Sequence, residues 1–348
     1  MLRRPRTLVL AAALLAACAP GDVEERPDGD EADDLAEEGP PVPALTEPDG
    51  TPRVALVKMP YHGGRNVPEL SGGPDYLEAG GISETLAERA VLRPVRTVEL
   101  TEEEERQYGE WNRMGLANAH LADFVEANLA DSALTVGLLA NCTSVIGVLA
   151  GLQGDGPGER RIGLVFIDAH GDFNTPETTL SGMLGGMPVA VSAGLALHNL
   201  RNTSGLEDPI PTEHIVMGAL RDLDPLEAEL IEEHALARVS TDDFRARSEK
   251  LHAEMRRLSE ETDVIYVHID MDVLDPAEVP GHPLTVPDGP TSEELAAALT
   301  EMFRYPKVAA LGIASTPWGD RDPDGVSRRA AYNLIEGALA GVRGRDGA

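Results

Sequence analysis

Short apolar runs alternate with longer amphipathic segments from about residue 52 to residue 342. The apolar runs are nearly continuous and rich in β-branched residues, which is typical of parallel strands covered on both faces. The predicted strands are Val54–Lys58, Val95–Val98, Leu134–Leu138, Ile162–Ile167, Ile215–Gly218, Val264–Ile269 and Val308–Ile313. This β-then-α rhythm has no interposed linker, so it predicts one α/β domain with three α/β/α layers and a mainly parallel sheet of about eight strands.

Two of the predicted helices begin with a capping box, a threonine followed three positions later by a glutamate. Thr101 and Glu104 begin the first, and its apolar stripe is Met114, Leu121, Val125 and Leu129. Thr291 and Glu294 begin the second, and its stripe is Leu295, Leu299 and Met302. In a parallel sheet the chemistry gathers at the carboxyl ends of the strands, so the residues that follow each strand are the candidates for function.

The first eighteen residues have a different pattern, three arginines followed by an apolar run that ends in small residues. The run is too short for a stable membrane span and has the form of an export signal. Its end, Leu15-Ala16-Ala17-Cys18, resembles the lipobox of bacterial lipoproteins, in which Cys18 becomes a lipid-carrying N-terminus. An ordinary signal peptide with an incidental cysteine is the alternative. A lipid anchor would hold an exported protein on a membrane, at the periplasmic or cell-surface face, without crossing it.

Residues 19–51 are acidic and Pro-rich, with few residues able to form a core. We therefore expect a disordered tether there, a catalytic domain over residues 52–342 and a flexible tail over residues 343–348. The net charge of −31 and the pI near 4.5 argue against nucleic acid as a partner, because phosphates would be repelled.

Two acidic motifs directly follow predicted strands. Asp168, His170 and Asp172 come after the fourth strand, and Asp270 and Asp272 come after the sixth. Side chains two apart project from the same side of an extended segment. One such motif alone is also compatible with a capped turn, but four aspartates at one end of a sheet would repel each other unless cations neutralised them. Carboxylates with an imidazole suit hard or borderline ions such as Mn²⁺.

The segments DAHGDFNTPETTLSG and HIDMDVLDPAEVPG resemble the metal-binding motifs of the ureohydrolase family, which includes arginase, agmatinase and formimidoylglutamase. The resemblance covers most of residues 52–342 and implies an arginase-like fold with two divalent metal ions. It implies that Asp168 and Asp270 bridge both ions, that His170 and Asp272 complete one ion's set, and that Asp172 ligates the other. It also implies a homo-oligomer, a trimer or hexamer.

The sequence departs from the family pattern at two positions. Cys142 stands where the family has a metal-ligating histidine, and Gly185 stands where arginases place a histidine thought to shuttle protons. A thiolate ligand would shift preference toward Fe²⁺, Co²⁺ or Zn²⁺, whereas a buried apolar thiol is the alternative. His268 lies two residues before Asp270, where the family prefers serine or threonine. We consider it as a catalytic partner of the metal ligands, against a histidine satisfied within the core.

The resemblance to arginases extends to the part of the site that holds an α-amino acid. Asn174 and Ser181 fall where the α-carboxylate is bound, with Thr179 beside them, and Asp224 falls where the α-ammonium is bound. Asp224 before Pro225 is alternatively a helix cap. Asp320 is the best match for the glutamate that orients the guanidinium, although it is one methylene shorter.

These features predict a hydrolase that cleaves a guanidine C–N bond with two metal ions. Arginine would give ornithine and urea, and N-hydroxyarginine would give ornithine and hydroxyurea, with Asp172 placed to manage the proton of the attacking water. Another ureohydrolase, namely an agmatinase, guanidino-acid hydrolase or formimidoylglutamase, is the first alternative. A lipoprotein that binds an amino acid or a metal without turnover is the second, and Cys142 and Gly185 are its basis.

Overall fold

The computed structural model describes residues 41–154 and 160–347. The expected signal sequence, Cys18 and the tether up to residue 40 lie outside the described residues. No helix of the described part of the chain is both long enough and apolar enough to cross a membrane.

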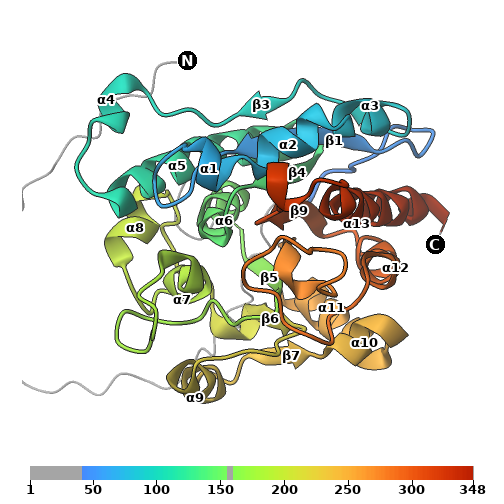
Figure 1. Ribbon diagram of the computed structural model, residues 1–348. Helices are drawn as coiled ribbons and strands as arrows, with labels where there is room; N and C mark the ends of the chain where they lie inside the picture. The colour runs from blue at the N-terminus through green and yellow to red at the C-terminus, as the bar shows by residue number, and fades with distance from the viewer. Residues whose placement is uncertain (1–40, 155–159, 348) are drawn as a thin grey trace, which may run out of the picture. The chain divides into compact units, whose positions relative to one another are not determined.

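A parallel sheet of nine strands, counted over the described residues, runs through the structure in the order β2-β1-β4-β9-β8-β5-β6-β7 (Figure 1). The ninth strand, β3, also pairs with β1, farther along β1 than β2 does. The strands are β1 (Arg53–Met59), β2 (Val91–Leu92), β3 (Arg96–Thr97), β4 (Leu134–Leu139), β5 (Ile162–Ile167), β6 (Ile215–Gly218), β7 (Ala237–Val239), β8 (Val264–Asp270) and β9 (Val308–Ala314). All seven predicted strands are present. The two-residue β2 and the three-residue β7 were not predicted, because so few residues carry no periodic signal.

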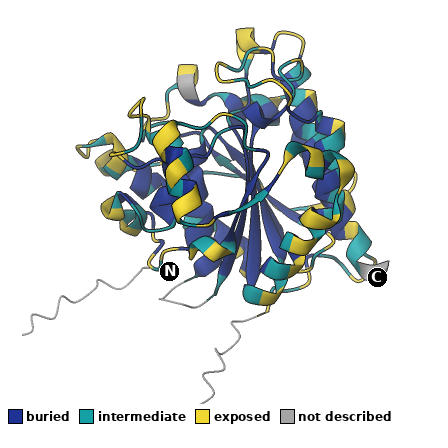
Figure 2. Cartoon of the chain, turned by 90° about the horizontal axis from the view of Figure 1, so that it is seen from below, coloured by how far each residue is buried: buried dark blue, intermediate teal, exposed yellow. Residues whose placement is uncertain are grey.

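Helices cover both faces of the sheet and confirm the three-layer prediction. Figure 1 shows α5 and α6 on one face and α11 and α13 on the other. The helices are α1 (Pro68–Ser71), α2 (Gly73–Ala79), α3 (Ile82–Ala87), α4 (Glu102–Glu105), α5 (Glu110–Ala130), α6 (Val145–Gln153), α7 (Pro188–Ser192), α8 (His198–Thr203), α9 (Pro225–Glu233), α10 (Thr241–Ala246), α11 (Glu249–Glu261), α12 (Ser292–Met302) and α13 (Val326–Arg343). Because both faces are covered, every residue of β4, β5, β6, β8 and β9 is buried (Figure 2).

The helix predicted to follow Thr101 is split in two. Thr101 caps α4 with the expected capping box to Glu104, but α4 ends after one turn at Glu105. Gly109 is then the N-cap of α5 and has a φ of +95°. Residues with a side chain rarely adopt this backbone conformation. The predicted box of Thr291 and Glu294 does begin α12.

The register of the sheet aligns the strand ends that carry the acidic motifs. Ile167 of β5 lies opposite Ile269 of β8, so Asp168 and Asp270 follow at the same level. Asp270 pairs in turn with Ala314 of β9. Side chains from three neighbouring strands are therefore delivered to one edge of the sheet.

Residues just before the predicted boundary at residue 52 contact the folded domain. The side chain of Leu45 is 2% exposed. The N–H of Arg53 donates to the carbonyl of Leu45 at 2.8 Å. At the other end, Arg345 donates to the carbonyls of Phe303 and Val308, so the first residues of the expected tail also contact the domain.

We expect Leu45→Ala to destabilise the domain by about 2–5 kcal/mol, because it removes a buried side chain and leaves a cavity. The free energy of unfolding in urea measures the effect. Val91→Ala is the control, since Val91 is 39% exposed and its truncation should change stability by less than about 0.5 kcal/mol. Equal stability of the two variants would show that residues 41–51 are not part of the folded unit.

Candidate metal centre

A pocket of about 490 Å³ opens at the carboxyl edge of the sheet. Its floor holds Cys142 after β4, Asp168, His170 and Asp172 after β5, and Asp270 and Asp272 at the end of β8. All six predicted metal ligands therefore line one pocket, although they come from segments as much as 130 positions apart in the chain.

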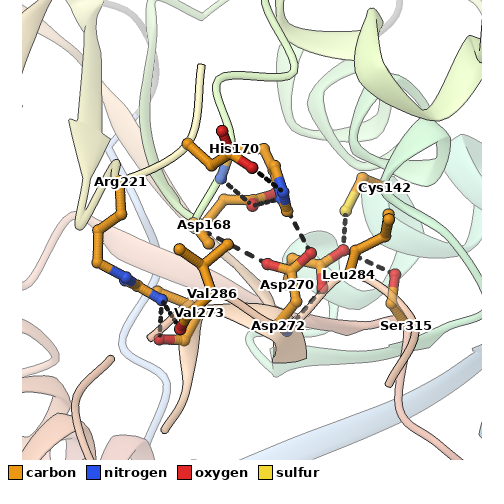
Figure 3. Close-up of polar contacts among 12 residues, drawn as sticks. Cys142, Asp168, His170, Arg221, Asp270, Asp272, Val273, Leu284, Val286 and Ser315 are labelled. Atoms are coloured by element: carbon orange, nitrogen blue, oxygen red, sulfur yellow. Dashed lines mark hydrogen bonds and ion pairs between the residues drawn. The ribbon is translucent and has the colours of Figure 1, made fainter. Parts of the chain in front are cut away.

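The donor atoms form three overlapping groups, in each of which they lie within 4.8 Å of one another. These are Cys142 with Asp168 and Asp172, Asp168 with His170 and Asp272, and Asp270 with Asp272 and His282. Nδ1 of His170 lies 3.1 Å from Oδ2 of Asp272 and 3.4 Å from Oδ1 of Asp168 (Figure 3). Imidazole and carboxylate atoms at this spacing are suited to binding the same metal ion.

The charges of this cluster do not balance within the protein. Burial raises the pKa of Asp168, Asp172 and Asp270, and repulsion from neighbouring carboxylates raises each pKa further. The same causes, burial followed by the charge of Asp168, raise the pKa of Asp272 to about 6. Divalent cations would remove this penalty by pairing with the ionised carboxylates. The residues present therefore fit a metal centre.

Cys142 belongs to the cluster and is not merely a core residue. Its Sγ lies 2.8 Å from Oδ2 of Asp270, which also accepts a hydrogen bond from Oγ of Ser315 at 2.7 Å (Figure 3). Burial raises the pKa of the Cys142 thiol, and the neighbouring aspartates raise it further. A cation bound beside it would reverse this effect, because a coordinating thiol loses its proton.

The backbone of the site is held in conformations that non-glycine residues rarely adopt. Asp172, Ala219 and Ser315, which follow β5, β6 and β9, have φ values of +45°, +62° and +60°. Gly171 is required by a close approach, since a Cβ there would lie 2.7 Å from the carboxylate of Glu227. Such local strain costs of order 1–3 kcal/mol per residue and concentrates at functional sites.

The loop after β8 is tied to the loop after β6 by the guanidinium of Arg221 (Figure 3). Arg221 donates to the carbonyls of Ala219 at 2.8 Å, Val273 at 3.0 Å, Val286 at 3.3 Å and Pro287 at 3.0 Å. This contact fixes the wall of the pocket beside the metal ligands.

The predicted substrate-binding residues lie mostly in the pocket wall. Asn174, Ser181 and Asp224 line it, and Nδ2 of Asn174 donates to Oδ2 of Asp224 at 3.2 Å. Asp224 is also the N-cap of α9, so the same residue caps a helix and lines the pocket. Thr179 does not line the pocket, but its hydroxyl lies 3.4 Å from that of Ser181.

The structure places two predicted catalytic residues outside the pocket. Asp320 is exposed on the short 3-10 helix Gly319–Arg321 and does not line the pocket, whereas the neighbouring Arg321 does. His268 is fully buried inside β8, where it stacks on Phe166 and hydrogen-bonds to the hydroxyl of Tyr266 at 2.7 Å. Burial lowers the pKa of His268 to about 3, so it stays neutral as part of the core.

The pocket also contains polar residues that the sequence analysis did not single out, among them His62, Glu227, His282 and Ser315. Ser315 directly follows β9, so the rule that identified Asp168 applies to it equally. Glu227 is three residues after Asp224 in a capping-box spacing, and its buried carboxylate accepts from the N–H of Phe173 at 2.9 Å. His62 and His282 lie in irregular segments without a comparable signal.

Comparison with known proteins identifies the family. The model of the arginase family matches residues 52–338. The chain belongs to the arginase family. It is therefore, as predicted, a hydrolase of C–N bonds in linear amidines, and the acidic clusters agree with the binuclear metal centre of this family.

Individual arginase-family proteins are similar over much of the chain. An arginase of Bacillus caldovelox is 28% identical over 250 residues, which cover 69% of this chain and 83% of that protein. The crystal structure of the B. caldovelox arginase superposes with a TM-score of 0.71 at 25% identity, covering 83% and 98% of the two chains. An N(omega)-hydroxy-L-arginine amidinohydrolase of Streptomyces lavendulae is 36% identical over 126 residues, 36% of this chain and 41% of that protein.

Replacing Cys142 tests its place among the ligands. We expect Cys142→His to shift the metal preference from Zn²⁺ or Co²⁺ toward Mn²⁺, because an imidazole is a harder donor than a thiolate. Competition between these ions, followed by metal analysis of the protein, measures the shift. Cys142→Ser is the matched control and should weaken Zn²⁺ binding without that gain. Unchanged affinity and preference in both variants would identify Cys142 as a packed thiol only.

Proposed function

We propose that this arginase-family hydrolase acts on the guanidine group of an α-amino acid, arginine or N-hydroxyarginine, and releases ornithine with urea or hydroxyurea. The observation that carries the proposal is the convergence of six donor residues from β4, β5 and β8 at the floor of one pocket. Two divalent ions bound there would lower the pKa of a water molecule so that hydroxide is available near neutral pH.

The residues of the pocket suit the remaining steps of this hydrolysis. Asp172 lines the floor, and in this proposal its carboxylate takes the proton of the attacking water. Asp224 and Asn174 together offer a carboxylate to an ammonium group and an amide to a carboxylate. Gly185 also lines the pocket, so protonation of the leaving amine falls to another group or to water.

The end of β9 favours including N-hydroxyarginine beside arginine. Ser315, Pro317, Trp318 and Arg321 are the pocket residues that this segment contributes, so within the described residues it brings no carboxylate to orient a guanidinium. A substrate that carries an oxygen on the guanidine offers this end of the pocket a hydrogen-bond acceptor, which the guanidinium of arginine lacks. The partial similarity to the amidinohydrolase of S. lavendulae points the same way.

Binding without turnover is the second candidate function. Cys142 and Gly185 favour it, because each replaces a histidine that the arginase resemblance implies, one for metal ligation and one for proton transfer. Following the N-terminal pattern, we further propose that the protein is exported and anchored through a lipid on Cys18. Globomycin-sensitive processing and labelling with a fatty-acid analogue in a bacterial host would test this, and Cys18→Ala should remove the label.

A substrate panel with each metal tests the proposed reaction. We expect urea from arginine or hydroxyurea from N-hydroxyarginine with at least one of Mn²⁺, Fe²⁺, Co²⁺ and Zn²⁺, and little product from agmatine or formimidoylglutamate. Asp270→Asn should abolish both turnover and bound metal, because the family resemblance implies that this carboxylate bridges the two ions. Tight arginine binding without product under any metal would establish the second candidate instead.

Arg321 offers a test of the substrate's carboxylate. Among the described residues that line the pocket it is the one arginine or lysine, and its guanidinium stacks on Trp318 at 5.3 Å. We expect Arg321→Ala to raise the KM for arginine by about tenfold, ~1.4 kcal/mol, with little change in kcat. The KM for agmatine, which has no carboxylate, should stay within about twofold. Arg238→Ala, on a surface arginine paired with Glu232, is the control. An equal rise for both substrates would exclude a carboxylate contact.

A further inference from the structure

One histidine of the pocket has no counterpart in the ligand set that the resemblance implies. His282 lies in the segment between β8 and α12, and its side chain is only 7% exposed. Its Nε2 lies 3.9 Å from Oδ1 of Asp270, and its donor atom groups with those of Asp270 and Asp272 within 4.8 Å. The imidazole is thus directed at the carboxylates of the metal centre.

The distance between Nε2 of His282 and Oδ1 of Asp270 suits two ligands of one ion better than a hydrogen bond. At 3.9 Å, Nε2 and Oδ1 are too far apart for a hydrogen bond, which needs about 2.7–3.2 Å. Two ligands that each lie about 2.0–2.2 Å from one ion are separated by roughly 3–4 Å, depending on the angle at the ion. The spacing therefore suits two ligands of the same cation.

The segment that carries His282 is held firmly. The N–H of His282 donates to the carbonyl of Val279 at 2.9 Å. The neighbouring Gly281 packs so closely against Arg321 that a Cβ would lie 2.0 Å from its carbonyl oxygen. With Pro283 on the other side, the backbone of His282 has little conformational freedom.

We propose that His282 is a ligand of the ion held by Asp270 and Asp272, a seventh protein donor of the centre. The inference rests on the proposed metal centre and extends it. The ion on the side of Cys142 then has a thiolate, and the other ion has two imidazoles, from His170 and His282. The additional imidazole nitrogen of His282 at one ion and the sulfur of Cys142 at the other favour Zn²⁺ or Co²⁺ over Mn²⁺.

Binding of a metal ion by Nε2 of His282 costs the ring its hydrogen bond from the N–H of Leu284. The N–H of Leu284 lies 3.2 Å from Nδ1 of His282, which places the proton of the neutral ring on Nε2. For Nε2 to bind a cation, that proton leaves to water and Nδ1 takes one up, so the neutral ring is kept and the Leu284 contact is lost. This contact is at the long end of the hydrogen-bond range, so little is given up.

Metal binding in the absence of substrate tests the proposal. Titration of the whole protein with Zn²⁺ alone and with Co²⁺ alone gives the stoichiometry and affinity, and the visible spectrum of Co²⁺ reports the donor set. We expect His282→Ala to weaken the second ion by tenfold or more and to change the Co²⁺ spectrum, since even outer partners of a ligand contribute 10–100-fold. His62→Ala is the matched control, because His62 lines the same pocket outside the three donor groups, and its metal binding should equal that of the wild type.

His282→Cys provides a positive test that does not depend on a loss. If the position reaches the ion, the new thiolate restores binding and increases the thiolate-to-Co²⁺ charge-transfer absorption. Wild-type stoichiometry, affinity and spectrum in His282→Ala would overturn the proposal, and a raised KM for arginine in that variant would then make His282 a substrate contact. A wild-type protein that binds no ion would overturn this inference and the metal centre together. Two bound ions that depend on His282, without turnover of any substrate, would support it while refuting the proposed reaction.

Discussion

Mutual repulsion between buried carboxylates is the constraint on which the rest of this structure depends. The register between β5 and β8 sets Asp168 and Asp270 at the same level, and the residues that follow add Asp172 and Asp272. The protein supplies few positive charges to balance these carboxylates. His170 lies beside Asp168 and Asp272, and the more distant Arg221 also interacts with these two aspartates. The fold thus concentrates negative charge where cations can enter from the pocket, and the stability of this edge is linked to their binding.

The sequence predicted the fold and the floor of the site because both depend on local patterns. Continuous apolar runs identified every strand of more than three residues, and the acidic motifs directly after two of them required no knowledge of tertiary contacts. The short β2 and β7 were not predicted, because strands of two or three residues are too short to show a hydrophobic period. The break at Gly109 was not predicted, because the sequence does not reveal the φ value of a single glycine.

The walls of the site were harder to predict, because loops have no periodicity. His282 and Arg321 reach the pocket from irregular segments, and only packing between those segments decides which side chain turns inward. Asp320 illustrates the limit, since sequence position alone cannot tell it from its neighbour Arg321. His268 shows a related limit, because alternation along β8 puts it on the same face as Asp270 but one step deeper, among Phe166 and Tyr266.

The network of Arg221 has a mechanical consequence for the pocket. One guanidinium gathers four carbonyl oxygens from two loops that are about fifty residues apart in the chain, so the two loops cannot shift independently. A hinge on this side would have to break several charge-assisted hydrogen bonds at once. Selection among incoming molecules on this side of the pocket therefore depends on the size and outline of a stiff opening.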